Sequence, residues 1–132
     1  MKSNGRLFNI CLLTIILIIN PFSYVFAQKH TFTKNVGILK NYVTGESTES
    51  KDIDPITIES LGGGRFKFSD LKESAIFKYS HMENGLYIYK KENTQSIIKC
   101  IQKMSEFAVG KPGKIIIEIE GAAFELRYTL GN

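Results

Sequence analysis

The stretch NTQSIIKCIQKMSEFAVGKPGKIIIEIEGAAFELRYTL, residues 93–130, decides the fold that the sequence predicts. Its first half is amphipathic with a helical period, because apolar side chains recur every three or four residues and polar ones fall opposite. The apolar side consists of Ile97, Ile101, Met104 and Ala108. Gly110 is a stop signal for such a helix. The pattern therefore predicts an amphipathic helix over residues 94–109.

The second half of that stretch alternates apolar and polar residues on both sides of Gly121. Before this glycine, Ile115, Ile117 and Ile119 alternate with Ile116, Glu118 and Glu120. After it, aromatic or aliphatic residues alternate with Glu125, Arg127 and Thr129. A period of two around a glycine indicates two antiparallel strands, each with one buried face. The helix is then expected to cover the apolar face of this hairpin.

Residues 1–27 have the layout of a secretory signal peptide. Lys2 and Arg6 precede an apolar run at residues 10–19, and Ala27 ends a stretch suited to cleavage. An uncleaved membrane anchor is the alternative, but about ten apolar residues are short for a bilayer span. We therefore expect an exported protein, periplasmic or extracellular, that is not embedded in a membrane after cleavage.

Removing 27 of the 132 residues leaves 105, which is enough for one domain with a modest core. The formal net charge falls from +4 to +2, because Lys2 and Arg6 leave with the signal. A charge so near neutrality gives no case for nucleic-acid binding. Cys100 is then the remaining cysteine, and its place beside the apolar helix side predicts a buried thiol rather than a nucleophile.

Two segments divide the rest of the chain. Residues 28–54 turn polar after a few apolar positions, so we expect an exposed arm, or a weak strand followed by a loop. Residues 55–132 form the predicted β-rich domain. Within it, the glycine run at residues 62–64 marks a hairpin turn or a bulged strand, since no helix follows that would make it a phosphate loop.

Asn84 and Gly85 lie between two β-rich runs and predict a two-residue hairpin turn. In that register Met82 faces Tyr87, Ser80 faces Tyr89 and Lys78 faces Lys91. The opposite face, with Phe77, Tyr79, His81, Leu86 and Ile88, is the more core-like. The candidate binding residues are therefore Tyr87, Tyr89, Lys78, Lys91 and Met82.

Tyrosines beside lysines are suited to stacking on sugar rings or to meeting an anionic group. The alternative is that this is an ordinary half-exposed strand. A register shift of one residue would move the ladder to the other face.

These elements predict an α+β, mostly β fold. Its form is a small antiparallel barrel or strongly curved sheet, with the OB-like order β-β-β-α-β-β. Over residues 56–130, the order and size resemble the receptor-binding B subunits of bacterial AB5-type toxins. That resemblance implies a ring of subunits that binds glycans. The chain departs from much of that family because it has no disulfide pair.

No catalytic motif, metal-ligand set or cofactor motif stands out. We therefore expect a non-enzymatic binding module that recognises a glycan, a peptide or an envelope protein. Such a module could also form a homo-oligomer. The alternative is an inhibitor or immunity-type protein that blocks a secreted or periplasmic enzyme through residues 44–54 and 62–64. A hydrolase that uses His81 with a carboxylate is the third hypothesis.

Overall fold

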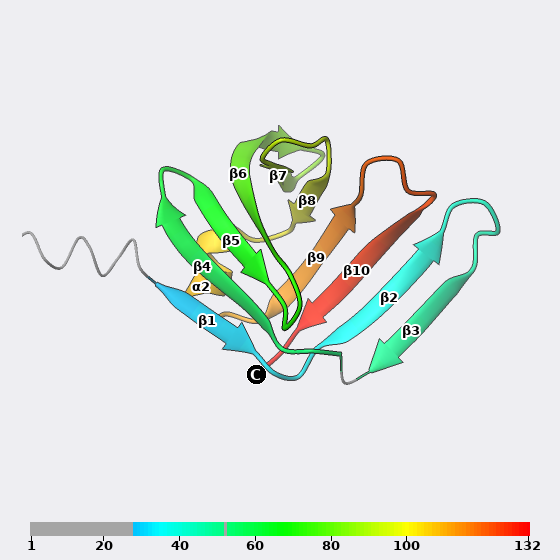
Figure 1. Cartoon of the computed structure of the whole chain (residues 1–132), viewed down its shortest axis with the longest axis horizontal. Coiled ribbons are helices and arrows are strands. Elements are labelled where there is room, and N and C mark those ends of the chain that lie inside the picture. Colours follow the sequence, from blue (N-terminus) through cyan, green and yellow to red (C-terminus); the bar gives the residue numbers. More distant parts are fainter. Residues whose placement is uncertain (1–27, 52) are drawn as a thin grey trace, which may run out of the picture.

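The computed structural model describes residues 28–51 and 53–132, so the predicted signal peptide at residues 1–27 lies outside the described residues. Within these ranges the chain forms a ten-stranded antiparallel sheet that curls into a half-barrel, together with one short helix (Figure 1). The prediction of a mostly β fold with a strongly curved antiparallel sheet and a helix is therefore confirmed.

The seven strands between Ile56 and Leu130 lie side by side in sequence order, whereas the three strands before them lie at the two edges of the sheet. They are β1 (Lys29–Phe32), β2 (Val36–Asn41), β3 (Ser47–Lys51), β4 (Ile56–Gly62), β5 (Arg65–Ser69), β6 (Ser74–Glu83), β7 (Leu86–Lys91), β8 (Ile97–Cys100), α2 (Met104–Ala108), β9 (Gly113–Glu118) and β10 (Phe124–Leu130). The spatial order is β1-β4-β5-β6-β7-β8-β9-β10-β2-β3. This is not the expected order β-β-β-α-β-β, because five strands from β4 to β8 precede the helix. The OB-like order is therefore not confirmed.

The N-terminal strands extend both edges of the sheet. β1 pairs with β4 at one edge, whereas β2 and β3 continue the other edge beyond β10. Residues 28–54 were predicted to form an exposed arm, or a weak strand followed by a loop, whereas the structure has the three strands β1, β2 and β3 in this range. All five residues of β3 are exposed, so this strand has no buried face that would give it an alternating apolar pattern.

The predicted helix at residues 94–109 is wrong in its first half. Residues Ile97–Cys100 form β8, which pairs with β7 and β9 and turns Ile98 and Cys100 into the core. Asn93, the residue just before the predicted helix, has φ of 67° in the β7–β8 turn. A short apolar run fits either period, and here the β-branched isoleucines favour the strand. Asn also serves turns and caps equally well.

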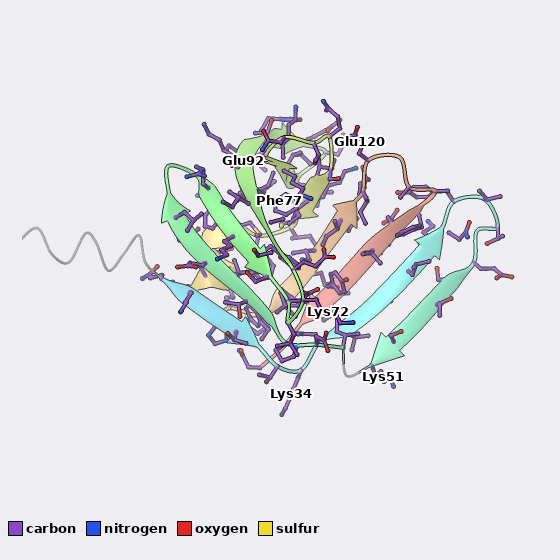
Figure 2. All side chains as sticks on the ribbon, in the orientation of Figure 1. Lys34, Lys51, Lys72, Phe77, Glu92 and Glu120 are labelled. Atoms are coloured by element: carbon purple, nitrogen blue, oxygen red, sulfur yellow. The ribbon has the colours of Figure 1, made fainter. Side chains whose placement is uncertain are left out.

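The remaining helix, α2, is a single short segment that contacts β4 and β1. Met104, Phe107 and Ala108 are buried at the spacing expected of one helical face. Ile101, which the helical projection placed on this face, is 69% exposed. Inside the curl these residues join the core residues Phe32, Ile56, Ile58, Phe66, Phe77, Tyr89, Ile98, Cys100, Ile115, Ile117 and Leu130. Figure 2 shows Phe77 within this interior.

The predicted turns at Asn84–Gly85 and around Gly121 are confirmed. Asn84 and Gly85 both have positive φ, as a tight hairpin turn requires, and join β6 to β7. β9 and β10 pair around Gly121. Gly63 and Gly64 form the β4–β5 turn, and Gly62 ends β4 next to a bulge. The sequence therefore located most of the hairpins of the second half of the chain.

One bulge changes the predicted register of β6 and β7. Met82 faces Tyr87 as expected, but the ladder shifts between Tyr79 and His81. Tyr79 therefore lies opposite Tyr89, and Lys78 lies opposite Lys90 rather than Lys91. A bulge adds one unpaired residue to a strand and so reverses the faces beyond it.

The buried side chain of Asn35 forms hydrogen bonds with backbone groups near both ends of the described chain. The Asn35 side chain donates to the Phe32 carbonyl at 2.8 Å and to the Asp54 carbonyl at 3.2 Å. Its side-chain oxygen accepts a hydrogen bond from the Gly131 backbone at 3.2 Å. Asn35 is 1% exposed, and its bond to the buried Phe32 carbonyl pairs a backbone group that water does not reach, while the bonds to Asp54 and Gly131 are partly buried.

Candidate functional site

A cleft of about 500 Å³ lies where β5, β6 and β7 approach the start of α2. The bulge in β6 creates it, because the shifted register turns Tyr79 to the same side as Tyr87 and Tyr89. We call it the tyrosine cleft. It is lined by Gly64, Phe66, Tyr79, Met82, Tyr87, Tyr89, Lys103 and Ser105.

The aromatic rings of the tyrosine cleft form a connected cluster. Tyr79 and Tyr89 meet edge to face with ring centroids 5.5 Å apart, and Phe66 and Tyr89 do so at 5.7 Å. The Tyr79 and Tyr87 centroids are 6.4 Å apart. Such contacts fix ring orientations beyond what area burial alone achieves. Tyr79 and Met82 are 41% and 52% exposed, so they present the accessible surface of the cleft.

Tyr89 is the buried floor of the cleft. It is 3% exposed, and its hydroxyl oxygen accepts a hydrogen bond from the Met104 backbone N–H at 3.0 Å. Burial raises the pKa of Tyr89 to about 12, although this hydrogen bond acts in the opposite direction. The phenol therefore stays neutral at physiological pH. It positions the helix and the neighbouring rings and does not itself reach solvent.

The rim of the cleft is polar at the α2 side, where Lys103 and Ser105 line it. Both are exposed. An ammonium and a hydroxyl there can donate hydrogen bonds to a ligand that rests on the rings. The lining residues include no carboxylate and no imidazole.

The structure brings together three of the five predicted site residues. Tyr87, Tyr89 and Met82 line the tyrosine cleft. Lys78 lies on the opposite face of the sheet, beyond the bulge and across from Lys90. Lys91 shares the concave face with Tyr89 but lines a different cavity. The predicted cluster of tyrosines and lysines on one face is therefore wrong for Lys78, whereas Lys91 lies on that face but outside the tyrosine cleft.

Sequence reasoning missed Tyr79, Phe66, Lys103 and Ser105. The predicted hairpin has no bulge and therefore places Tyr79 on the core-like face. A signal was present in β6: its apolar alternation runs through Phe77 and Tyr79 and then resumes out of phase at Met82. A change of phase within one strand indicates a bulge. Lys103 and Ser105 come from another element, which local patterns do not place.

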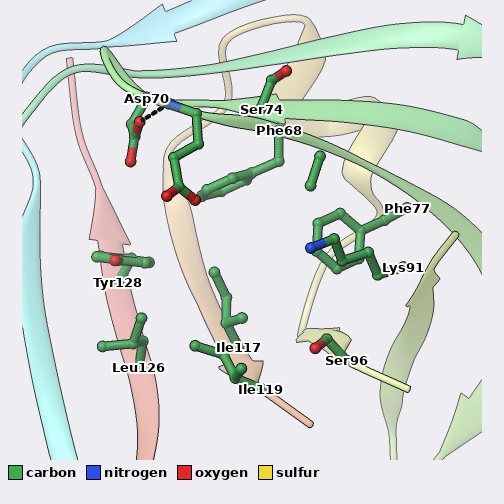
Figure 3. Close-up of a pocket in the computed structure, with 12 residues that line it drawn as sticks. Phe68, Asp70, Ser74, Phe77, Lys91, Ser96, Ile117, Ile119, Leu126 and Tyr128 are labelled. Carbon is green, nitrogen blue, oxygen red and sulfur yellow. Dashed lines mark hydrogen bonds between the residues drawn. The ribbon is translucent and has the colours of Figure 1, made fainter. Parts of the chain in front are cut away.

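A second cavity, of about 260 Å³, lies on the concave face of the sheet (Figure 3). We call it the concave cavity. It is lined by Phe68, Asp70, Glu73, Ser74, Ala75, Phe77, Lys91, Ser96, Ile117, Ile119, Leu126 and Tyr128. A neighbouring cavity of about 300 Å³ shares Leu126 and Tyr128 with it and extends toward Thr48 and Ser50 of β3. The apolar floor therefore continues toward the open edge of the sheet.

Charged groups of both signs line the concave cavity. Asp70 Oδ1 accepts hydrogen bonds from the Lys72 and Glu73 backbones, both at 2.8 Å, which fixes the β5–β6 turn. Burial raises the pKa of Tyr128, and the carboxylate of Asp70 adds to that rise. Lys91 enters from β7 opposite Phe77. The sequence pattern gave no sign of this cavity, because its walls come from five hairpin strands and a turn.

His81, the residue of the hydrolase hypothesis, lies outside both cavities. Its Nδ1 is 2.8 Å from the Ser80 hydroxyl, and its Nε2 is 3.6 Å from a Glu83 carboxylate oxygen. All three residues are exposed on one strand. The described ranges contain no group of three or more histidine, cysteine, aspartate or glutamate side chains placed to hold a metal ion.

Comparison of the chain with protein-family models, curated proteins and solved structures found no match. In residues 28–51 and 53–132, no helix has the length and apolar character that a membrane crossing needs.

Proposed function

We propose that this chain is an exported, non-enzymatic binding module that holds a glycan in the tyrosine cleft. The observation that carries the proposal is the exposed ring of Tyr79, which lies beside Tyr87 and Met82 over the buried ring of Tyr89. Aromatic surface of this size, held rigidly and left open to water, is typical of a recognition site.

The chemistry of a sugar fits this cleft. A pyranose ring presents an apolar face of C–H groups that packs on tyrosine rings, and its hydroxyls project from the ring edge. Lys103 and Ser105 lie at the rim, where they can bond to such hydroxyls. The edge-to-face contacts of Tyr89 with Tyr79 and Phe66 hold the platform in place before a ligand arrives.

The same cleft supports a binding role over catalysis. General acid–base chemistry needs a titratable group within hydrogen-bond reach of the reacting atoms. The lining residues offer three phenols, a lysine and a serine, without a histidine or carboxylate to activate them. His81 lies on the other face of β6, paired across from Ile88.

A glycan array with titration of the best ligand tests the proposal. Tyr79→Ala and Tyr87→Ala are each expected to weaken binding about tenfold, because each removes a stacking ring. The matched control is Tyr42→Ala, since Tyr42 is 51% exposed but belongs to the β2–β3 turn. Equal affinity of the parent and both cleft variants for every glycan contradicts the proposal.

Export is the other part of the proposal, and it is tested separately. The protein recovered from the periplasm or medium is expected to begin at Gln28, which intact-mass measurement reads directly. Retention of residues 1–27 on the recovered protein contradicts cleavage at the predicted position.

The inhibitor role is a second candidate, and the β2–β3 hairpin favours it. Every residue from 42 to 51 is exposed, and Val43 at its tip is 80% exposed. A projecting hairpin with an apolar tip suits insertion into the active site of an enzyme. A single stoichiometric enzyme recovered by the parent protein, and lost with Val43→Asp, supports this role. Retention on carbohydrate alone counts against it.

A further inference from the structure

The concave cavity combines an apolar floor with charges of opposite sign on facing sides. Phe68, Ile117 and Leu126 belong to its floor. Figure 3 places Asp70 and Lys91 on opposite sides of the cavity, with Glu73 contributed by the same turn as Asp70. A ligand complementary to this arrangement has an apolar body, a cationic group at one end and an anionic group at the other.

The geometry points to a second ligand site, which binds a short apolar peptide with free amino and carboxyl termini. The α-ammonium group lies toward the carboxylates of Asp70 and Glu73, and the α-carboxylate lies toward the ammonium group of Lys91. The apolar side chains rest on the floor. This site goes beyond the proposed glycan binding and shares no lining residue with the tyrosine cleft.

Lys91 is the residue that most favours a ligand with a free carboxylate. Its partner across the hairpin is the buried Phe77, so it lies on the concave face of the sheet. Lysines ordinarily lie on the solvated face of a strand, as Lys78 and Lys90 do here. A lysine on the wall of an apolar cavity gives an anionic group a charged partner at that position.

The acidic side favours a free amine for a similar reason. Asp70 uses one carboxylate oxygen, Oδ1, for the turn, and no hydrogen bond involves the Glu73 carboxylate in the described part of the chain. A fatty acid would leave these carboxylates unused, and a cationic amphiphile would leave Lys91 unused. A peptide with free ends satisfies both sides.

The space available fits more than one amino-acid residue. The concave cavity and its neighbour, about 260 and 300 Å³, meet at Leu126 and Tyr128. Together they fall in the range of roughly 300–1,000 Å³ that is usual for ligand pockets. Thr48 and Ser50 at the far end offer hydroxyls to a peptide backbone.

Calorimetric titration of the protein with trileucine tests this site. Trileucine with free ends is expected to bind, and N-acetylation or C-amidation is each expected to weaken binding about three- to tenfold, because each removes one charge contact at a solvated rim. Raising the salt concentration is expected to reduce the difference in affinity between free and blocked trileucine. Failure of free trileucine to bind overturns the inference, and so does equal binding of the doubly blocked peptide.

Two charge-neutralising variants assign the ends of the peptide. In Glu73→Gln, N-acetylation of trileucine is expected to weaken binding less than it does in the parent protein, while C-amidation weakens binding as before. In Lys91→Gln, C-amidation is expected to weaken binding less, while N-acetylation weakens binding as before. Lys78→Gln, on the opposite face, is the matched control and is expected to change neither. A parent-like response of both Glu73→Gln and Lys91→Gln overturns the assignment. The blocked peptides are measured on the parent protein, so the inference can be contradicted even if a variant misfolds.

Glycan binding is measured on the same samples. Tyr79→Ala is expected to leave trileucine affinity unchanged, because its ring is not part of the concave cavity. If Tyr79→Ala loses glycan binding and keeps trileucine binding, the two sites are independent. Absence of glycan binding then contradicts only the proposed function, and absence of trileucine binding contradicts only the second site.

Discussion

The hydroxyl of Tyr89 accepts a hydrogen bond from the backbone N–H of Met104 at 3.0 Å. The first N–H groups of a helix have no partner within the helix, so a buried helix start needs an acceptor from elsewhere. Met104 is fully buried, and a strand tyrosine supplies that acceptor. The floor of the tyrosine cleft and the position of α2 are therefore set by one contact.

Tyr89→Phe is expected to lower the free energy of unfolding by about 1–3 kcal/mol, because it leaves the buried Met104 N–H without an acceptor. Urea unfolding measures the change. Tyr79→Phe is the matched control, since Tyr79 is 41% exposed, and is expected to stay within about 0.5 kcal/mol of the parent. Equal stability of the two variants contradicts the role of the Tyr89 hydroxyl.

Alkaline pH is expected to destabilise the protein through Tyr89 and Cys100. Burial raises both pKa values to about 12, from ordinary values of 10.0 and 9.0. Above its ordinary pKa each group ionises in the unfolded chain while the folded protein keeps its proton. The stabilisation is therefore complete below about pH 9 and is lost as the pH rises toward 12.

The measurement is the free energy of unfolding in urea as a function of pH. Its slope is expected to be negative above pH 9, at up to about 1.4 kcal/mol per pH unit for each group. Tyr89→Phe is expected to flatten the part of the curve above pH 10. An unchanged slope in this variant would show that Tyr89 ionises freely in the folded state.

The thiol of Cys100 is expected to resist alkylation in the folded protein. It is 1% exposed, and its raised pKa lowers the thiolate fraction at pH 8 relative to an ordinary cysteine. Iodoacetamide labelling followed by mass spectrometry is expected to be slow without urea and rapid with it. Equally rapid labelling in both conditions contradicts the buried position.

Asn35→Ala is expected to destabilise the protein by about 2–4 kcal/mol, because it leaves the Phe32 and Asp54 carbonyls and the Gly131 N–H without their partner. Asn35→Asp keeps an acceptor for Gly131 but loses both donations. It is therefore expected to be destabilising as well. Thermal unfolding of the two variants checks this, and a parent-like melting temperature for Asn35→Ala would contradict it.

The hairpins of the second half were predictable because their chemistry is local. Asn84 and Gly85 adopt positive φ, and the strands after Gly121 alternate with one buried face. The helix was misplaced for the same reason, since Ile97 and Ile98 in a run of four fit a strand or a helix equally well. Pairing of β8 with both β7 and β9 decided between them, and that pairing is not local.

The candidate site was predictable only up to the bulge. Tyr87 and Met82 face each other as the turn required, but one extra residue at Ser80 moved Tyr79 into the cleft and Lys78 out of it. The approach of Lys103 and Ser105 from α2 depends on tertiary packing. Edge strand β3 was missed because a strand exposed on both faces has no apolar signal.

The register of β6 decides which side chains reach the tyrosine cleft, and a comparison of ligand affinity between Tyr79→Ala and Lys78→Ala tests that register. The bulged register predicts that Tyr79→Ala weakens glycan binding about tenfold and that Lys78→Ala leaves it unchanged. The regular register would place Lys78 beside Tyr89 and turn Tyr79 away. Weaker binding with Lys78→Ala and parent-like binding with Tyr79→Ala would therefore contradict the account.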